Sequence, residues 1–445
     1  MRLMLIVVMA VITLCLAETA AAQQKTRDQK VREDRERVTE QGFWIYNDLN
    51  AAFARARTSG KPILAVLRCI PCEECVKLDD ELVDQDPVLK PLLEKFVCVR
   101  IVSTNGLDLS LFQFDTDQSF AVFMLNADRT IYGRFGTRSH RTEWVGDVSL
   151  KGLSKALEGA LELHAAAPAS KAILAAKTGP IPAFASPELM PSLRDKYASQ
   201  LNYSGDVAKS CIHCHQIGDA QRDLSRSRNE AIPEPLLNPY PHPRSLGLIL
   251  NPDERATVKE VRQGSLAESA GLHAGDRITH LNGQPMLSIA DVQWVLHNLS
   301  PDGDSILFNL RRGEALHAVT LQLPAGWRTL DDISWRTSAW GLRRMVTGGL
   351  KLEPINPADR GQGGIPLDGM ALQVRHVGQY GPHAAAKNAG FQTGDVLVSF
   401  DGRNDLLTDS DVLRYGASEK SPGDQIAVEI IRAGERRTLQ LPMQE

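Results

Sequence analysis

One internal repeat constrains what this chain can fold into more than any other feature. The stretch SLAESAGLHAGDRITHLNG at residues 265–283 matches AAAKNAGFQTGDVLVSFDG at residues 384–402. Each copy reads as a short helix ending in Ala-Gly and an apolar residue, then Gly-Asp before a strand, then an Asn/Asp-Gly turn. The copies lie 119 residues apart, far beyond the period of a solenoid, so the chain carries two complete domains of one type.

The repeat resembles the PDZ domains that are attached to exported bacterial proteases. The shared core A-G-[LF]-x-x-G-D, at residues 270–276 and 389–395, carries the resemblance. It implies binding of protein or peptide C-termini, because PDZ domains pair an extended peptide with a strand edge and hold its carboxylate with backbone N–H groups. The loops assigned to the carboxylate are Ser245-Leu246-Gly247-Leu248 and Trp340-Gly341-Leu342.

The N-terminus predicts export. The apolar run from Leu3 to Leu16 is about 14 residues long, too short to span a bilayer. It follows a single arginine and precedes the small residues Ala20-Ala21-Ala22, which are typical of a cleavage site. We predict a signal peptide removed near Ala22 and a periplasmic or otherwise exported mature chain without a membrane span. An uncleaved N-terminal anchor is the alternative.

Five of the seven cysteines fall in two short motifs. The first motif is RCIPCEEC at residues 68–75, and the second is CIHCH at residues 211–215. Cys15 leaves with the signal peptide, and Cys98 reads as a buried apolar residue of a strand. In an oxidising compartment, clustered pairs of cysteines indicate redox or cofactor chemistry more than stapling disulfides.

The first motif has the layout of a reversible dithiol. An apolar strand at residues 63–67 leads to Cys69, at the start of a predicted helix whose dipole and free N–H groups favour a thiolate. Cys72 lies three residues further on and can close a disulfide with Cys69. Residues 43–165 show helix and strand patterns that resemble a thioredoxin-like domain. The resemblance implies Cys69 as the attacking thiol and Cys72 as the resolving thiol.

Three departures from the thioredoxin pattern keep other chemistry open. Phe120 stands where the family usually has a cis-proline, and Ile63 falls near the place of its buried acid. Glu73 and Glu74 add negative charge that raises thiol pKa values. Cys75 is a third thiol, so a metal site of three thiolates and a structural disulfide are the alternatives to a redox dithiol.

The second motif, Cys211 to His215, is typical of c-type haem. Two thiols add to the haem vinyl groups, and the adjacent His215 reaches the iron as an axial ligand. His242 and Met190 are the candidates for the second axial ligand. Zinc held by Cys211, Cys214 and a histidine is one alternative, and a plain disulfide is the other.

Composition excludes several functional classes. The net charge of −4 over 445 residues gives no basic field for nucleic acid. A protease would be the natural companion of such PDZ domains, but the sequence contains neither a G-x-S-x-G nor an HExxH motif. We therefore predict that the chain is not a protease.

These features together predict a multidomain chain: an α/β thioredoxin-like domain followed by two α+β, mostly β, PDZ-like domains. The combination resembles a bacterial family of thioredoxin-like/PDZ-domain proteins. The predicted divisions are a signal peptide (1–22), a charged tether or frayed helix (23–42), the thioredoxin-like domain (43–165), a linker with the haem-type segment (166–243), and PDZ domains at 244–324 and 338–443.

The leading hypothesis is an exported redox protein with a dithiol and haem c, in which the PDZ domains hold a protein partner. This leaves thiol–disulfide oxidoreductase activity open. The alternatives are a non-catalytic periplasmic PDZ adaptor and a metal-binding protein that uses the three cysteines of the first motif.

Overall fold

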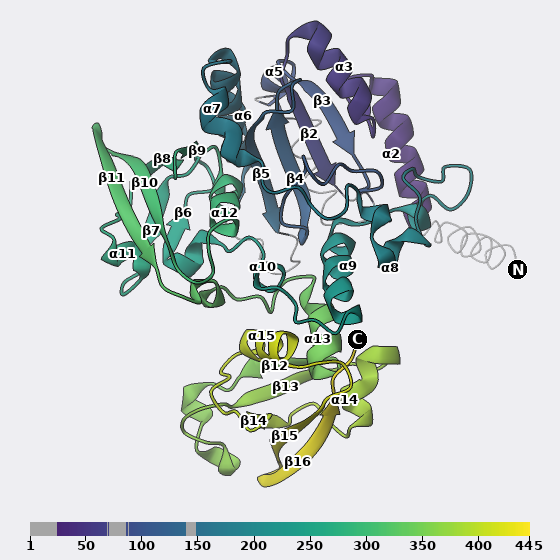
Figure 1. Ribbon diagram of the computed structural model, residues 1–445, viewed down its shortest axis with the longest axis vertical. Coiled ribbons are helices and arrows are strands. Elements are labelled where there is room, and N and C mark those ends of the chain that lie inside the picture. Colours follow the sequence, from purple (N-terminus) through teal and green to yellow (C-terminus); the bar gives the residue numbers. More distant parts are fainter. Residues whose placement is uncertain (1–24, 69, 71–85, 88, 139–147) are drawn as a thin grey trace, which may run out of the picture.

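The computed structural model describes residues 25–68, 70, 86–87, 89–138 and 148–445 (Figure 1). The predicted signal peptide and the thiols of Cys69, Cys72 and Cys75 lie outside the described residues. Within the described ranges, no helix is long and apolar enough to cross a bilayer. Figure 1 shows the predicted thioredoxin-like sheet at the top, with the first repeat domain beside it and the second below.

The first domain is built on a five-stranded sheet in the order β1-β3-β2-β4-β5. β2 pairs in parallel with β3, whereas β4 and β5 form an antiparallel hairpin beside β2. Every residue of β2 is buried, as expected for a central strand that reads as one apolar run. The strands are β1 (Ile45–Tyr46), β2 (Ile63–Arg68), β3 (Val97–Ile101), β4 (Gln118–Leu125) and β5 (Ile131–Arg138).

Helices cover both faces of this sheet. The helix α3 (Leu49–Ser59) packs on one face, and α6 (Leu150–Ala165) and the short α5 (Lys90–Leu93) pack on the other. Local sequence sets the ends of α3, because the Asp48 side chain accepts from the N–H of Ala51 and Gly60 ends the helix at φ +69°.

The charged stretch predicted as a tether or frayed helix is the packed helix α2 (Arg27–Gln41). Val31 and Val38 are buried, and the buried Asp34 pairs with Arg100 of β3 at 2.9 Å. Expecting a solvated segment was therefore wrong, since α2 docks through two apolar residues, the ion pair of Asp34 and hydrogen bonds from Arg32 to the carbonyls of Tyr203 and Gly205.

The stretch 166–243, expected to be a linker, is folded against the first domain. The loop between β3 and β4, residues 102–117, contains no helix. Residues 184–220 fill that part of the sheet face, and Met190, Ile212 and Ile217 are buried in the same cluster as β2 and β3. Its elements are α7 (Lys171–Leu174), η1 (Ala175–Lys177), η2 (Pro187–Leu189), α8 (Pro191–Arg194), η3 (Ala208–Ser210), α9 (Cys214–Ser227) and α10 (Glu234–Leu237).

The two repeat domains share one plan in which the repeated Gly-Asp serves the same purpose. Asp276 accepts from Arg312 at 2.7 and 2.8 Å, and Asp395 accepts from Arg432 at 2.6 and 2.7 Å. Each is a nearly buried carboxylate with a bidentate arginine, which fixes the short helix against the last hairpin. The repeated acid therefore has a structural use.

The first repeat domain contains η4 (Pro243–Leu246), β6 (Leu248–Leu250), β7 (Val258–Val261), α11 (Leu266–Ser269), β8 (Arg277–Leu281), β9 (Gln284–Pro285), α12 (Ile289–His297), β10 (Asp304–Arg312) and β11 (Ala315–Leu323), and η5 (Trp327–Leu330) follows it. The second contains α13 (Ala339–Thr347), β12 (Leu350–Pro354), η6 (Pro357–Asp359), η7 (Gln362–Gly364), β13 (Leu372–Val377), η8 (Gly381–Ala384), α14 (Ala385–Asn388), β14 (Val396–Phe400), α15 (Asp409–Glu419), β15 (Gln425–Arg432) and β16 (Glu435–Pro442).

The first repeat domain is fastened to the thioredoxin-like sheet through α12. Asp291 of α12 accepts from the backbone N–H of Arg134 at 3.1 Å and pairs with Lys177 at 2.8 Å, both inside the protein. The indole N–H of Trp294 donates to the carbonyl of Ala176 at 3.0 Å. Residues 289–296 of α12 are all buried, so this helix is part of a domain interface.

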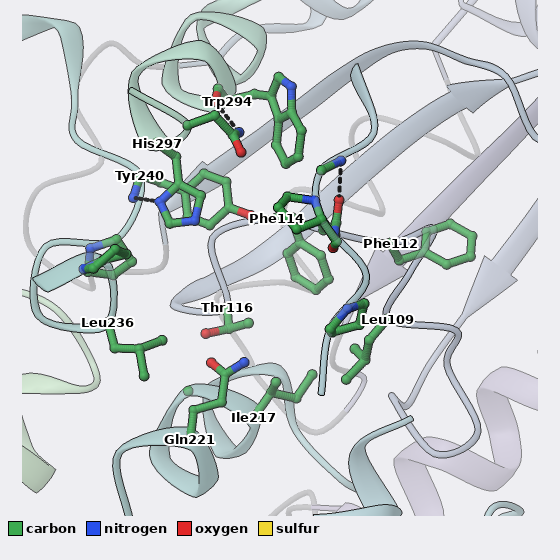
Figure 2. A pocket seen from close by; sticks show the side chains of 18 of the residues that line it. Leu109, Phe112, Phe114, Thr116, Ile217, Gln221, Leu236, Tyr240, Trp294 and His297 are labelled. Atoms are coloured by element: carbon green, nitrogen blue, oxygen red, sulfur yellow. Dashed lines mark hydrogen bonds between the residues drawn. The ribbon is translucent and has the colours of Figure 1, made fainter. Parts of the chain in front are cut away.

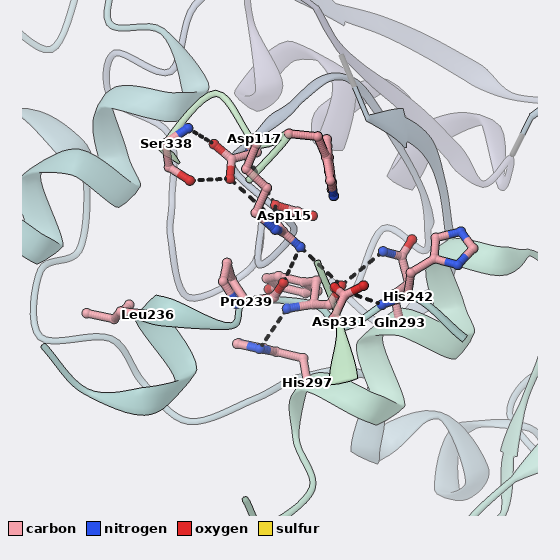
Figure 3. Close-up of polar contacts among 12 residues, drawn as sticks. Asp115, Asp117, Leu236, Pro239, His242, Gln293, His297, Asp331 and Ser338 are labelled. Carbon is pink, nitrogen blue, oxygen red and sulfur yellow. Dashed lines mark hydrogen bonds and ion pairs between the residues drawn. The ribbon is translucent and has the colours of Figure 1, made fainter. Parts of the chain in front are cut away.

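A buried ion-pair cluster fastens the second repeat domain (Figure 3). Arg336, which precedes α13, contacts Asp115 at 2.9 Å and Asp117 at 3.2 Å from the loop before β4. Ser338 adds hydrogen bonds from its N–H and its hydroxyl to Asp117. Both repeat domains are therefore held against the first domain by buried polar contacts.

Candidate functional site

The carboxyl ends of β2 and β3 define the edge of the sheet where the first cysteine motif begins. Leu67 and Ile101 are register partners in a parallel pair, so both strands end at this edge. Ile70, the residue between Cys69 and Pro71, is buried with Val31, Val102 and Val207 in one apolar cluster. Cys69, Cys72 and Cys75 themselves fall outside the described residues.

The loop that follows β3 forms hydrogen bonds with the second cysteine motif. The carbonyl of Ile212 accepts from the N–H of Thr104 at 3.0 Å and from its hydroxyl at 2.9 Å. The Asn105 side chain accepts from the N–H of Ile212 at 2.8 Å and donates to the carbonyl of Ser210 at 3.0 Å. The CxxCH segment is thus built into the same edge of the sheet as the end of β2.

Both thiols of the second motif are held in their protonated form. Cys211 is 3% exposed and its Sγ donates to the carbonyl of Val207 at 3.3 Å. Cys214 is the first residue of α9 and packs against the apolar cluster of β2 and β3. Burial raises the pKa of Cys211 to about 11 and that of Cys214 to about 12. Neither is therefore an attacking thiolate at neutral pH.

The two histidines of the motif stack on each other. The rings of His213 and His215 are parallel within 2°, with their centroids 5.8 Å apart. Burial lowers the pKa of His213 to about 4, and the neighbouring His215 and Arg27 act in the same direction. His213 is therefore neutral at physiological pH.

Haem c at Cys211 and Cys214 stays a prediction, and the described arrangement fits it poorly. Cys211 is covered on all sides, whereas a thioether would need its Sγ to face the porphyrin. Met190 is 2% exposed within the apolar core. His242 caps η4, where its Nδ1 accepts from the backbone and side chain of Arg244. Of the three residues predicted as axial ligands, only His215 is half-buried rather than buried. Among the described residues, no cluster of three His, Cys, Asp or Glu is placed to hold a metal ion.

Phe120 lies in β4, opposite the end of β2. It pairs with Arg68, the residue immediately before Cys69, and is 1% exposed. A buried aromatic ring thus stands opposite the start of the first motif, at the place where the resemblance leads one to expect a cis-proline. Ile63, at the place of the family's buried acid, is fully buried and apolar.

In the first repeat domain, the predicted carboxylate loop leads directly from η4 into β6. Leu246 ends η4, Gly247 has φ +87° and Leu248 begins β6. The N–H of Gly247, however, donates to the carbonyl of Arg244 within its own turn. A terminal carboxylate would have to compete with this bond.

The loop predicted for the second repeat domain is wrong. Trp340, Gly341 and Leu342 lie inside α13. The position equivalent to Gly247 is Gly349, because the carbonyl of each accepts from the N–H of the residue that ends the following strand pairing, Arg262 after β7 and Gly378 after β13. Leu350 then begins β12. The Trp-Gly-Leu string imitates the loop by composition, whereas backbone conformation decides it: Gly349 has φ +93° and Gly341 is helical.

A cavity of about 190 Å³ lies where three parts of the chain meet (Figure 2). Phe112 and Phe114 approach it from the loop before β4, Ile217 and Gln221 from α9, and His297 from α12. Burial lowers the pKa of His297 to about 3, and its Nδ1 accepts from the N–H of Tyr240 at 3.3 Å. The helix that begins with Cys214 therefore shares a cavity wall with the first repeat domain.

Sequence reasoning missed the residues that join these parts. Thr104 and Asn105 sit in a polar loop without any motif, and only their place after a buried strand could have singled them out. Asp409 was missed as well, although it is the first residue of α15 and almost fully buried.

Comparison with known proteins defines the class of each domain. A thioredoxin-like family profile matches residues 44–127, and PDZ profiles match residues 257–312 and 361–443. The chain therefore contains a thioredoxin-like domain followed by two PDZ domains, which we now call PDZ1 and PDZ2.

Among curated proteins, the chain is similar to periplasmic serine proteases. It is 29% identical over 143 residues to a probable periplasmic serine protease do/HhoA-like of Haemophilus influenzae, covering 32% of this chain and 26% of that protein. It is 28% identical over 180 residues to the periplasmic pH-dependent serine endoprotease DegQ of Escherichia coli, covering 40% of this chain and 34% of that protein.

The chain thus spans about a third or less of these two relatives, and the likeness is at the level of the PDZ domains. A solved HtrA-type protease AlgW with decapeptide matches 32% of this chain and 49% of that chain at 12% identity, with a TM-score of 0.20.

Proposed function

We propose that this protein is an exported thiol redox protein whose two cysteine motifs work at one edge of the thioredoxin-like sheet, while the PDZ domains hold a protein partner. One observation supports this most. Ile70 of the first motif packs against Val207, and the carbonyl of Val207 accepts from the thiol of Cys211. The two motifs are thereby neighbours in space although 142 residues separate Cys69 from Cys211.

The proposed chemistry is thiol–disulfide exchange. The Cys69 thiolate attacks a disulfide of the partner and releases one partner thiolate, which takes up a proton. Cys72 then attacks the Cys69 sulfur of the mixed disulfide and releases the second partner thiol. The partner gains two electrons, and Cys69 and Cys72 end as a disulfide. Cys211 and Cys214, protonated and buried, suit a reserve dithiol better than an attacking one.

Export and partner binding complete the proposal. The relatives are named as periplasmic proteins, which favours a periplasmic location for this chain. PDZ domains imply protein or peptide binding, and the finer proposal, capture of partner C-termini, concerns the loop at Leu246, Gly247 and Leu248.

Insulin reduction with dithiothreitol as electron donor tests the redox proposal. We expect the full-length protein to accelerate the reaction and the Cys69→Ser protein to lose the acceleration. Cys98→Ser is the matched control, because Cys98 is 3% exposed and burial raises its pKa far above neutrality. Equal rates for the parent and Cys69→Ser proteins would refute thiol exchange.

A non-catalytic PDZ adaptor is the second candidate, and Phe120 favours it. Phe120 packs in the core with Leu64 and Val66 and stands opposite Arg68 at the start of the first motif, where the resemblance leads one to expect the cis-proline that faces the dithiol. An adaptor would leave insulin reduction unchanged in every cysteine variant while still binding its partner.

A further inference from the structure

A cavity not yet accounted for lies beside β12 of PDZ2. It has a volume of about 530 Å³ and is bounded by Lys351–Pro354 of β12, by the first residues of α15 and by residues 329–336 of the preceding connection. Trp335 and Trp340 stand on its rim, and the side chain of Trp340 is 46% exposed. Nothing in the proposed redox chemistry uses this cavity.

Its wall contains a buried carboxylate with one unused oxygen. Asp409 is 3% exposed, and its Oδ2 accepts from Arg343 of α13 at 2.5 and 3.1 Å. Its Oδ1 is buried and has no hydrogen-bond partner. Burial raises the pKa of this carboxyl, and the charge of Arg343 and the N–H of Leu352 on β12 oppose that rise only in part. An unpaired buried acceptor is costly, so a donor that reached Oδ1 would be strongly favoured.

The charges around the cavity favour a cation. Five acids line it, against four bases. Arg336 pairs with Asp115 and Asp117 and Glu353 pairs with Arg375, all outside the cavity lining, which leaves three bases to face four acids. The indole rings of Trp335 and Trp340 already carry the guanidinium groups of Arg336 and Arg343, 5.1 and 5.3 Å from the ring centroids, so the aromatic lining is of a kind that holds cations. The acids are Asp331, Asp332, Glu353, Asp409 and Asp411, and the remaining bases are Arg343, Lys351 and Arg414.

The strand beside the cavity can take an added strand. β12 is the first strand in the order β12-β13-β14-β15-β16, so within the described chain one of its edges has no partner strand. An extended segment that paired there would pass over Asp409. The N–H groups of Gly348 and Gly349 both donate to the carbonyl of Arg343, so the usual donors for a terminal carboxylate are occupied.

We propose that this cavity binds the side chain of a lysine or arginine in an internal, extended segment of a partner protein, which pairs with β12. Asp409 is the residue that determines specificity, because its Oδ1 accepts from the cation. The inference rests on the proposed role of the PDZ domains in holding a partner, and it names the chemistry that PDZ2 recognises.

Peptides blocked at both ends test the proposal on the full-length protein. Three acetylated and amidated nonapeptides with Thr and Val flanks carry a central lysine, norleucine or glutamate, and calorimetry measures each Kd. We expect the lysine peptide to bind about tenfold more tightly than the norleucine peptide, since a charge-assisted bond to a buried acceptor is gained. The glutamate peptide should bind most weakly.

Two variants test whether the cavity is the binding site for the lysine side chain. Asp409→Asn keeps the side-chain size and should abolish the preference for lysine over norleucine. Glu435→Gln is the control, because β16 lies at the opposite edge of the same sheet. Arg343 loses part of its partner in Asp409→Asn, so Trp340→Leu provides a second variant. It keeps both members of the Arg343–Asp409 ion pair, removes only the ring that lies 5.3 Å from the Arg343 guanidinium, and should weaken lysine binding several-fold.

Equal affinity for the three peptides would overturn the proposal, as would an unchanged lysine preference in both variants. A free-acid peptide that binds more tightly than its amide would also overturn it, since recognition would then be of a C-terminus. The Cys69→Ser protein should bind the lysine peptide normally, so a failure of the redox proposal would be seen separately.

Discussion

The buried contacts of Arg336 hold PDZ2 against the thioredoxin-like domain, and their removal has a calculable cost. Arg336, Asp115 and Asp117 are each at least 96% buried. In Arg336→Met, two carboxylates remain inside the protein without the guanidinium that contacts both. Breaking a buried pair in this way costs about 3–5 kcal/mol, because the surviving charge has lost its water and its partner.

Hydrogen exchange followed by mass spectrometry measures this cost at the right place. A multidomain chain does not unfold in one step, so the opening free energy of residues 331–338 is more informative than a global midpoint. We expect it to fall by about 3–5 kcal/mol in Arg336→Met. Arg436→Met is the control, because its pair with Glu429 at 3.1 Å is exposed and should contribute less than about 1 kcal/mol.

The pKa shift of Asp117 predicts how the stability loss in Arg336→Met changes with pH. Burial raises the pKa of Asp117, but the charges of Arg336 and Arg222 outweigh burial and leave it below its ordinary value. This carboxylate therefore stabilises the fold above its unfolded pKa of about 3.9, and the contribution is lost as pH falls through the folded pKa.

Burial raises the pKa of Asp117, and in the variant less positive charge opposes this effect. The pKa therefore rises, and Asp117 takes up a proton in the folded protein already in mild acid. The deficit of Arg336→Met should accordingly be largest near pH 7 and shrink toward pH 4. A deficit below about 1 kcal/mol, or one that does not change with pH, would refute the reasoning.

Two further predictions concern the cysteine edge and the PDZ2 loop. Asn105→Ala removes the bonds to Ile212 and Ser210 and leaves a buried N–H unpaired, so the CxxCH segment should open more easily, by about 1–3 kcal/mol. Alkylation of Cys211 by iodoacetamide should then be faster in the variant at every pH. In both proteins the rate should rise with pH toward about 11, where the thiolate forms; equal rates would contradict the contacts described. Gly349→Ala places a Cβ 2.1 Å from the carbonyl oxygen of His383 at φ +93°, and PDZ2 should lose about 2 kcal/mol or more in thermal unfolding. The control Gly264→Ala, at φ +73° with nothing within 4 Å, should lose less, and similar losses would contradict the clash.

Much of the fold follows from the sequence because the decisive signals are local. The apolar run of β2 and the hairpin of β4 and β5 can be identified from periodicity and turn residues alone. The repeated Gly-Asp marks both PDZ domains because each Asp holds an arginine of the last hairpin in the same way.

The remaining features depend on contacts between distant segments. Residues 184–220 lack the pattern of a domain, yet Met190, Ile212 and Ile217 among them are buried, because the loop between β3 and β4 supplies no helix to that face of the sheet. The Trp-Gly-Leu string at 340–342 matches a PDZ loop by composition, and only the left-handed conformation of Gly349 places the loop correctly. Asp409 has no motif at all, and its burial is set by α13 and β12.

The placement of the second cysteine motif limits how the two ends of the molecule can influence each other. Cys214 begins α9, and Ile217 and Gln221 of the same helix line the cavity that His297 of PDZ1 lines from the other side. A change that exposed the two thiols would have to break the hydrogen bonds of Thr104 and Asn105 to Ile212. It would also move the start of α9. Because packed interfaces do not deform continuously, that movement would reach α12 through the shared cavity wall. We therefore expect oxidation of the second motif to alter the contact between PDZ1 and the thioredoxin-like domain before it alters other contacts.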